Sequence, residues 1–177
     1  HTTSFITWAN RMNQLSVKFS DSNVEKRYWD NIVKTPIDLI NQEGVNLGSI
    51  KDRKHSRIKL EKEISSQIFN RLVSDTRVTQ EHILLTSILI ALKRSYSITS
   101  IPILMEGYGR EEYLTQTTLS RSVGWFTNTY PLIFEIQDDI LQTLIQVKDT
   151  INRVPHNGIG YGLLHLGNAH LQDLDPE

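Results

Sequence analysis

The sequence predicts an α/β protein, and the order of its segments supports this class. Residues Ile101–Met105 form an apolar run without polar alternation, which fits an interior strand. Two segments with helical periodicity, residues 61–73 and 79–92, precede this run. A short alternating segment, residues 55–60, is the strand expected before them. A strand–helix–helix–strand order indicates helices layered on a sheet.

The N-terminal segment predicts a helical arm over residues 1–36. Thr3 and Ser4 offer an N-cap, and apolar residues then recur at helical spacing: Phe5, Trp8, Met12, Leu15 and Phe19. Ser22–Glu25 has the pattern of a capping box that begins a second helix, and Lys34–Pro36 ends it. Residues 37–54 are polar, contain glycine and have no period, so they predict a loop.

A buried helix, a β ribbon and a further helix are also expected in the body of the chain. Residues 83–92 are apolar nearly all round, which predicts a helix buried on most sides under a sheet. Residues 122–136 are rich in strand-forming residues, interrupted by Gly124. A further helix should follow Gln137, and the glycines of 158–162 predict a flexible turn.

Composition excludes several functional classes. The 177 residues are 38% hydrophobic and 22% charged, as in a soluble globular protein, and the net charge of −1 gives no footprint for nucleic acid or an anionic membrane. The absence of cysteine excludes disulfides and thiolate chemistry and is compatible with a cytoplasmic location. No apolar run is long enough to span a membrane, and no signal peptide is visible. The six histidines show no metal-ligand spacing, so no metal site is expected.

Chemistry is expected where the interior strand ends. The segment Glu106–Glu111 turns at two glycines and presents a carboxylate and a guanidinium, Glu106 and Arg110. Loops at strand ends can aim such charged groups into a cleft. Glu111 and Glu112 are expected to be solvated, and His82 is expected to be a satisfied core residue. His156 and His165 bracket the glycine turn.

Three motifs in this order resemble those of nonribosomal peptide synthetase epimerization domains, members of the condensation-domain superfamily. Here they read EGYGREE, SRSVGWFTNTYP and PHNGIGYG, against EGHGRE, RTVGWFTxxYP and PxxGxGYG in the family. Residues 81–92 resemble the helical motif that precedes them. Three features differ from the family pattern: Tyr108 replaces a histidine, and the HHxxxDG and FNYLGQ motifs are absent.

The resemblance implies the C-terminal half of a V-shaped condensation/epimerization domain with a chloramphenicol-acetyltransferase-like two-layer sandwich. Residues 1–177 would then be one subdomain, with a helical arm (1–36), a loop (37–54) and an α/β body (55–177) whose floor ribbon is 122–136.

The implied activity is conversion of L-aminoacyl or peptidyl thioesters to the D form in antibiotic and other secondary-metabolite biosynthesis. This epimerization needs an acid and a base at Cα. The resemblance assigns Glu106 and Arg110 as catalytic residues, while a structural ion pair between them is the alternative. Side chains that could line the substrate and pantetheine channel are Tyr108, Trp125, Phe126, Asn128 and Tyr130.

The implied cofactor and partners follow from the same resemblance. No cofactor is bound directly, because the substrate is carried on the 4′-phosphopantetheine of a peptidyl carrier protein. The other partners are the missing N-terminal half of the domain and neighbouring synthetase modules, and the chain alone is expected to be inactive. Two other readings stay open: an amide-forming condensation domain, and a non-catalytic module that only docks carrier proteins.

Overall fold

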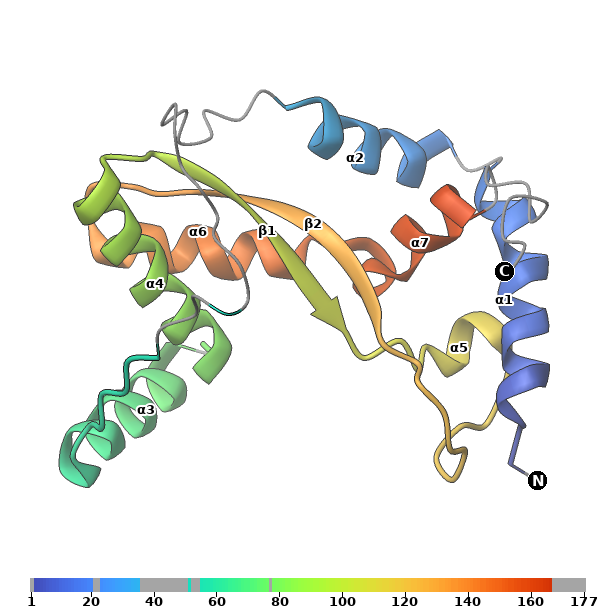
Figure 1. Ribbon diagram of the computed structural model, residues 1–177, viewed down its shortest axis with the longest axis horizontal. Coiled ribbons are helices and arrows are strands. Elements are labelled where there is room, and N and C mark those ends of the chain that lie inside the picture. The colour runs from blue at the N-terminus through green and yellow to red at the C-terminus, as the bar shows by residue number, and fades with distance from the viewer. Residues whose placement is uncertain (1, 21–22, 36–50, 52–54, 77, 167–177) are drawn as a thin grey trace. The chain divides into compact units, whose positions relative to one another are not determined.

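The computed structural model describes residues 2–20, 23–35, 51, 55–76 and 78–166 (Figure 1). The described helices and strands follow one another in this order: α1 (Phe5–Ser20), α2 (Asn23–Lys34), α3 (Lys62–Thr76), α4 (Gln80–Tyr96), β1 (Ser100–Gly107), α5 (Glu112–Thr115), β2 (Asn128–Glu135), α6 (Ile140–Asn152), the 3-10 helix η2 (Pro155–Gly158) and α7 (Ile159–Leu166).

The chain forms two compact units. The first unit contains His1–Pro36, Pro102–Ile133 and Thr150–Glu177, and the second contains Ile37–Ile101 and Phe134–Asp149. The predicted helical arm therefore belongs to the same unit as all three sequence motifs.

Strands β1 and β2 pair with each other in a two-stranded sheet. In the second unit the amide of Ile136 donates to the carbonyl of Thr99 at 2.7 Å. In the first unit the backbone of Gly107 lies against the side chain of Asn128. Residues 99 and 107 thus lie beside 136 and 128, so the strands run antiparallel, as Figure 1 also shows.

Alternate residues of β2 are buried. Leu132 and Phe134 are fully buried, and Ile133 between them is only partly covered. This alternation is the period-two pattern of a strand with one face in a core.

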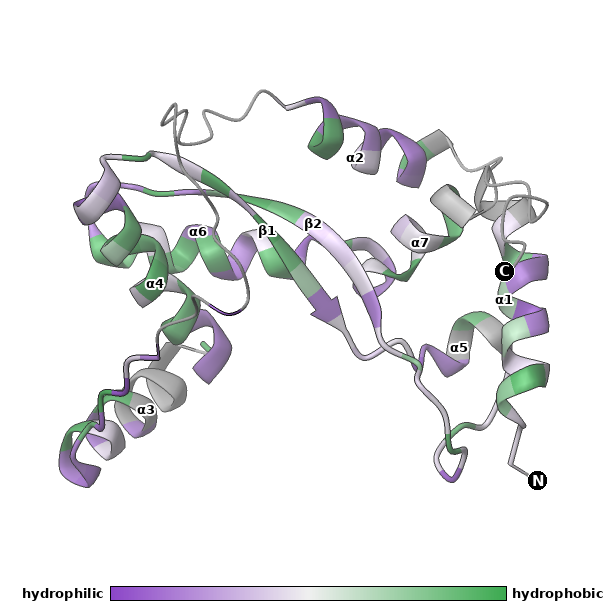
Figure 2. Cartoon of the chain, viewed as in Figure 1, coloured by the Kyte–Doolittle hydropathy of each residue, from purple (hydrophilic) through white to green (hydrophobic). Residues whose placement is uncertain are grey.

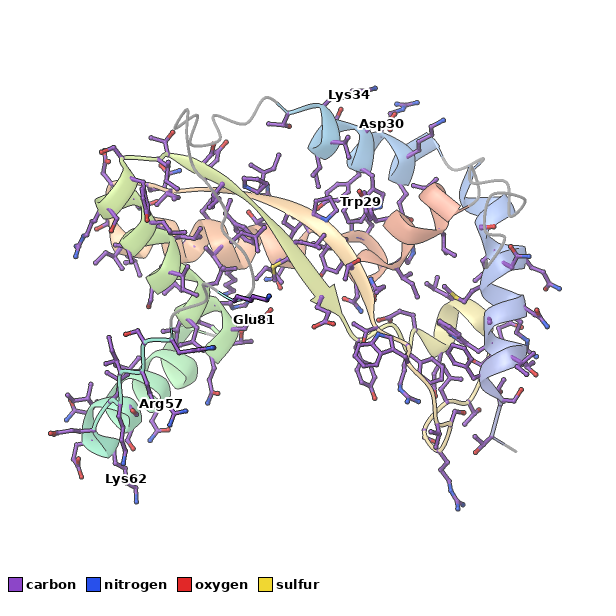
Figure 3. The ribbon with its side chains drawn as sticks, in the orientation of Figure 1. Trp29, Asp30, Lys34, Arg57, Lys62 and Glu81 are labelled. Atoms are coloured by element: carbon purple, nitrogen blue, oxygen red, sulfur yellow. The ribbon has the colours of Figure 1, made fainter. Side chains whose placement is uncertain are left out.

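The first unit is built around contacts of α1 with α2, α5 and α7. Ser4 caps α1 by accepting the amide of Thr7 at 3.2 Å. The rings of Phe5 and Trp8, one turn apart on α1, contact Phe126 with centroid distances of 5.2 and 4.9 Å. On α2, Trp29 lies on the side that faces α7 (Figure 3), where its ring contacts Tyr130 and Tyr161.

The second unit has a separate apolar cluster. Val78, Ile83 and Leu144 are buried together, with Ile68 of α3 packed against them. Apolar residues run along α4 and α6 (Figure 2), which supply Ile83 and Leu144. Helix α4 begins at a complete capping box, in which Thr79 and His82 each accept the other's backbone amide.

Several expectations from the sequence are confirmed. The two helices predicted over 61–73 and 79–92 correspond to α3 and α4, and Thr79 is the N-cap of α4. The helix expected after Gln137 is α6. A strand does cover Ile101–Met105, as β1, but the prediction that it is interior is wrong, because the described sheet has only two strands and Leu104 on β1 is 69% exposed. The capping box at Ser22 and most of the predicted loop, 37–54, lie outside the described residues.

Two other strand predictions need correction. Residues 55–60 form no strand, and Ile58 and Leu60 are exposed rather than inward-facing. Alternation alone is a weak strand signal when no partner strand is present. The ribbon expected from Ser122 begins as a strand only at Asn128, because residues 122–127 are irregular around Gly124.

Two predictions about helices also need correction. Helix α4 buries one face, made by His82, Ile83, Thr86 and Leu89. Leu84 and Ile88 on it are 53% and 54% exposed, so the helix is not covered on most sides. The glycines of 158–162 do not form one flexible turn, because Gly160 and Gly162 lie inside α7.

Candidate functional site

The three sequence motifs meet in the first unit. At the end of β1, a Cβ added at Gly107 would lie 2.6 Å from Oδ1 of Asn128 and 2.8 Å from the carbonyl oxygen of Asn157. The side-chain amide of Asn128 donates to that carbonyl at 3.3 Å. We call Gly107, Asn128 and Asn157, one residue from each motif, the motif junction.

A second glycine brings the first two motifs into contact. Gly109 has a φ of +71°, and a Cβ there would lie 1.6 Å from the carbonyl oxygen of Phe126. Only glycine fits this combination of left-handed backbone and close approach. The first motif therefore requires glycine here for packing against the second.

The 155–158 turn is held in an unusual backbone conformation. His156 and Asn157 both have left-handed φ values, of 48° and 51°, and Gly158 has a φ of +81°. A Cβ at Gly158 would lie 2.0 Å from the ring of Tyr130. Non-glycine residues adopt this conformation only where their surroundings stabilise it.

Two buried carboxylates supply that stabilisation. Oε1 of Glu111 accepts the side-chain amide of Asn157 at 3.0 Å, and Oε2 of Glu25 lies 2.9 Å from Nδ1 of His156. Their residues are only 8% and 5% exposed. Oε1 of Glu25 also lies 3.4 Å from the indole nitrogen of Trp29, one turn along α2.

Glu106, the predicted acid/base, has an exposed side chain near the end of β1. Among the described residues no ion pair joins it to Arg110. The alternative expectation of a structural Glu106–Arg110 ion pair is therefore wrong. The carboxylate is available to solvent next to the motif junction.

Arg110 organises the loop that follows α5. Its guanidinium donates to the carbonyl oxygens of Leu119 at 2.6 Å and Ser122 at 3.1 Å. It also lies 3.9 Å from the centroid of the Phe126 ring and 5.8 Å from that of Tyr108. These contacts tie the first motif to the start of the second.

The residues predicted to line a channel differ in exposure. Phe126 and Tyr130 are 4% and 7% exposed and pack inside the first unit. Tyr108 and Trp125 are 74% and 79% exposed. Asn128 is half-buried, and its Oδ1 is buried without a hydrogen-bond partner in the described part of the chain.

Sequence reasoning missed the role of Glu111, Glu112 and Glu25. Glu111 and Glu112 were expected to be solvated, but Glu111 is buried and Glu112 accepts the amide of Leu119. Glu25 lies four residues before Trp29, so both share a helix face, and this spacing is the one signal that could have indicated a buried carboxylate. No comparable signal pairs Glu111 with Asn157.

Burial shifts the pKa of two groups. Burial raises the pKa of Tyr28, as does neighbouring Tyr130, against a smaller opposite effect of Arg153. Burial lowers the pKa of His82, and Lys148 lowers it further, while Glu81 acts in the opposite direction. His82 lies in the second unit, buried at the start of α4 as expected.

No group of three or more metal-ligating side chains gathers anywhere in the described ranges. Within those same ranges, no helix has the length and apolar character needed to cross a membrane.

Comparison with known proteins identifies the family in which these three motifs occur together. The Condensation domain family matches residues 1–176, and the chain belongs to this family. The fold is that of a solved family structure, the epimerization domain from the third module of tyrocidine synthetase B. That structure superposes with a TM-score of 0.71 at 26% identity, over 96% of this chain and 40% of the other. The family and fold predicted from the motifs are therefore confirmed.

Several relatives of this chain are peptide synthetases. Surfactin synthase subunit 1 of Bacillus subtilis (strain 168) is 30% identical over 98% of the chain and 5% of the relative. Bacitracin synthase 2 of Bacillus licheniformis is 32% identical over 79% of the chain and 6% of the relative. Bacitracin synthase 3 of the same organism is 31% identical over 79% of the chain and 2% of the relative. The chain thus spans only a small part of each relative's length.

Proposed function

We propose that this chain is part of a nonribosomal peptide synthetase epimerization domain. Such a domain converts an L-aminoacyl or peptidyl thioester on a carrier protein to its D form. A base removes the Cα proton, the electron pair moves into the thioester carbonyl to give an enolate, and an acid returns a proton to the opposite face. The chain is the C-terminal half of that domain, and a half carrying the HHxxxDG histidine completes the site.

The observation that carries this proposal is the environment of Glu106. Its exposed carboxylate precedes the glycine on which the second and third motifs converge. An acid/base residue must reach substrate and must also be held in a fixed place. Exposure meets the first requirement, and the close-packed motif junction meets the second.

Arg110 belongs to the proposal as a residue that shapes the site. Its guanidinium is bonded to two backbone carbonyls and stacked on Phe126. These contacts favour a role in holding the 119–126 loop over direct stabilisation of the substrate's charge.

The proposed substrate path uses exposed motif residues. Tyr108 and Trp125 present exposed aromatic surface, and the side chain of half-buried Asn128 is proposed to hydrogen-bond the pantetheine arm. Phe126 and Tyr130 are buried, so their proposed role is to support the channel by packing inside the first unit rather than to line it. The domain needs no cofactor of its own, since 4′-phosphopantetheine arrives with the carrier protein.

The partners follow from the same proposal. They are a peptidyl carrier protein, the rest of the domain and the neighbouring synthetase modules, in the cytoplasm. The tyrocidine synthetase neighbour is itself an epimerization domain, which supports this assignment. A condensation activity is the second candidate, because the matching family is named for condensation.

The test uses the synthetase module that contains this chain, with its carrier protein loaded with an L-amino acid. We expect the Cα proton to exchange with deuterated water and the released amino acid to be partly D. Glu106→Gln keeps the size of the side chain and removes its proton chemistry, so it should slow this exchange about 100-fold or more. Glu135→Gln, an exposed carboxylate on β2, is the matched control and should leave the rate unchanged.

Other outcomes assign the other functions. No exchange in the wild type, with amide formation when a second loaded carrier is added, makes the chain part of a condensation domain. Neither reaction, with carrier binding retained, makes it a docking module. Exchange that is equally fast in Glu106→Gln removes Glu106 from the mechanism.

A further inference from the structure

The two buried carboxylates that hold the 155–158 turn have no part in the proposed chemistry. Glu111 accepts a hydrogen bond from the side chain of Asn157, and Glu25 is hydrogen-bonded to His156. A buried carboxylate loses hydration, and its partners offset that cost only in part, so stability alone is a weak reason for such a group. A role in placing other residues accounts better for Glu111.

Asn157 is bonded at both its side chain and its backbone. Its side-chain amide donates to Glu111 at 3.0 Å, and its backbone carbonyl accepts from Asn128 at 3.3 Å. The same carbonyl oxygen lies 2.8 Å from the position that a Cβ on Gly107 would take. The backbone of Asn157 therefore lies against the backbone of Gly107.

The turn depends on these contacts because Asn157 is in the left-handed region, with a φ of 51°. Asn tolerates this region better than most residues, but two successive left-handed residues, His156 and Asn157, persist only when the surroundings determine them. Without an acceptor for its amide, Asn157 loses one of the bonds that define its conformation.

We propose that Glu111 is a positioning residue for Glu106, acting through Asn157 and Gly107. This inference rests on the proposed function, because it assigns Glu106 the acid/base role. Glu106 adjoins Gly107 along β1, so the carbonyl of Asn157 braces the backbone that carries the carboxylate. Glu111 itself needs no contact with substrate.

Two substitutions in the intact module separate positioning from chemistry. Glu111→Gln keeps an oxygen that accepts the Asn157 amide, so exchange of the Cα proton should stay within about threefold of wild type. Glu111→Ala removes the acceptor, and a misplacement of about 1 Å can cost about 100-fold in rate. We expect kcat to fall about 10- to 100-fold in Glu111→Ala, with KM and both limbs of the pH profile unchanged.

A reversed pair gives a rescue test. Asn157→Asp alone sets two carboxylates against each other and should slow exchange as much as Glu111→Ala does. Adding Glu111→Gln restores the hydrogen bond with its direction reversed, because the glutamine amide donates to the carboxylate of the aspartate at position 157. The rate should then recover. Glu135→Gln again serves as the control, since that side chain is exposed.

Deuterium uptake at backbone amides gives a readout that does not depend on catalysis. Glu111→Ala should increase uptake in the peptides that contain residues 106–110 and 155–158, while Glu111→Gln should not. If the wild-type module shows no Cα exchange but uptake changes in this way, the proposed function fails and the coupling through Asn157 stands.

Three results overturn the inference. If Glu111→Gln slows exchange as much as Glu111→Ala does and one limb of the pH profile is lost, Glu111 is itself an acid/base residue. An unchanged rate in Glu111→Ala, while Glu106→Gln is inactive, removes the positioning role. Unchanged uptake at both peptides in Glu111→Ala removes the coupling.

Discussion

At the scale of single residues, glycines and buried acids determine the site more than the catalytic candidates do. Gly109 and Gly158 allow backbone or ring contacts that any side chain would block. Glu25 and Glu111 then hold the residues that surround them. The candidate acid/base Glu106 stays exposed on this framework.

Gly109 provides a test of this packing. Gly109→Ala adds a Cβ at a φ of +71°, only 1.6 Å from the carbonyl oxygen of Phe126. The left-handed backbone costs about 1–2 kcal/mol and the clash adds to it, so we expect the free energy of unfolding to fall by at least about 2 kcal/mol. Urea unfolding of the chain measures this change.

Gly162→Ala is the matched control for Gly109→Ala. This glycine lies inside α7, and a Cβ there would meet nothing within 4 Å. We expect a gain of about 0.5–1 kcal/mol from the better helix former. Equal losses at both positions would contradict the packing described for Gly109.

The site shows what sequence can and cannot predict about single residues. The motifs identified Glu106, Arg110 and Asn128 as residues of one site, and the structure brings their segments together. Glu111 and Asn157 are 46 positions apart, and their bond was not foreseen, because a charged residue beside another acid usually indicates a solvated surface. Burial of such a residue is decided by the tertiary fold.

At the scale of elements, periodicity predicted the helices well and the strands less well. Helices α3, α4 and α6 follow a 3.6-residue apolar pattern over many residues. A pattern of that length is a strong helix signal. The strand expected over residues 55–60 had only alternation to support it. The apolar content of α4 also led to the wrong prediction that the helix is buried on most sides. Leu84 and Ile88 are exposed, so composition does not determine how many faces a helix buries.

The start of α4 gives a prediction for pH dependence. Nδ1 of buried His82 accepts the amide of Thr79 at 3.1 Å, which requires a neutral ring, and burial lowers the pKa of His82 below its ordinary 6.5. The unfolded chain then binds the proton more readily than the folded chain, so the stabilising effect is full above about pH 6.5 and declines as the pH falls below it. Glu81 opposes this shift, and Lys148 adds to it.

His82→Gln should remove this contribution. Glutamine at this position accepts the Thr79 amide in a capping box and does not titrate, so the loss of stability between about pH 7 and 5 should be smaller than in the wild type. Melting temperatures across this pH range measure the difference. Thr79→Ala, the control, should cost about 1 kcal/mol at every pH and keep the wild-type slope. Parallel pH curves for wild type and His82→Gln would contradict the prediction.

At the scale of the whole molecule, the chain has two compact units with separate apolar clusters. Trp29, only 2% exposed, joins α2 to Tyr130 and Tyr161 in the first unit. Ile83 joins α4 to Leu144 in the second. Each cluster should therefore govern the stability of its own elements.

Trp29→Ala and Ile83→Ala test this division. Loss of the indole should cost about 3–5 kcal/mol and speed amide exchange in α1, α2 and α7, while α4 keeps its protection. Ile83→Ala should cost about 2–5 kcal/mol and produce the opposite pattern. Val33→Ala, at a side chain on α2 that is 58% exposed, should change neither set. Uniform loss of protection in both variants would show that the units unfold as one.

The division into units also determines what an optical probe of this protein reports. All three tryptophans, Trp8, Trp29 and Trp125, belong to the first unit. Intrinsic indole fluorescence therefore follows the first unit alone, whereas circular dichroism in the far ultraviolet follows the helices of both. Because Trp125 is 79% exposed while Trp29 is shielded from water, quenching by iodide should act mainly on Trp125. Trp125 is thus a native fluorescent reporter within the second motif. Its emission can be followed while a carrier protein is titrated, without attaching a dye.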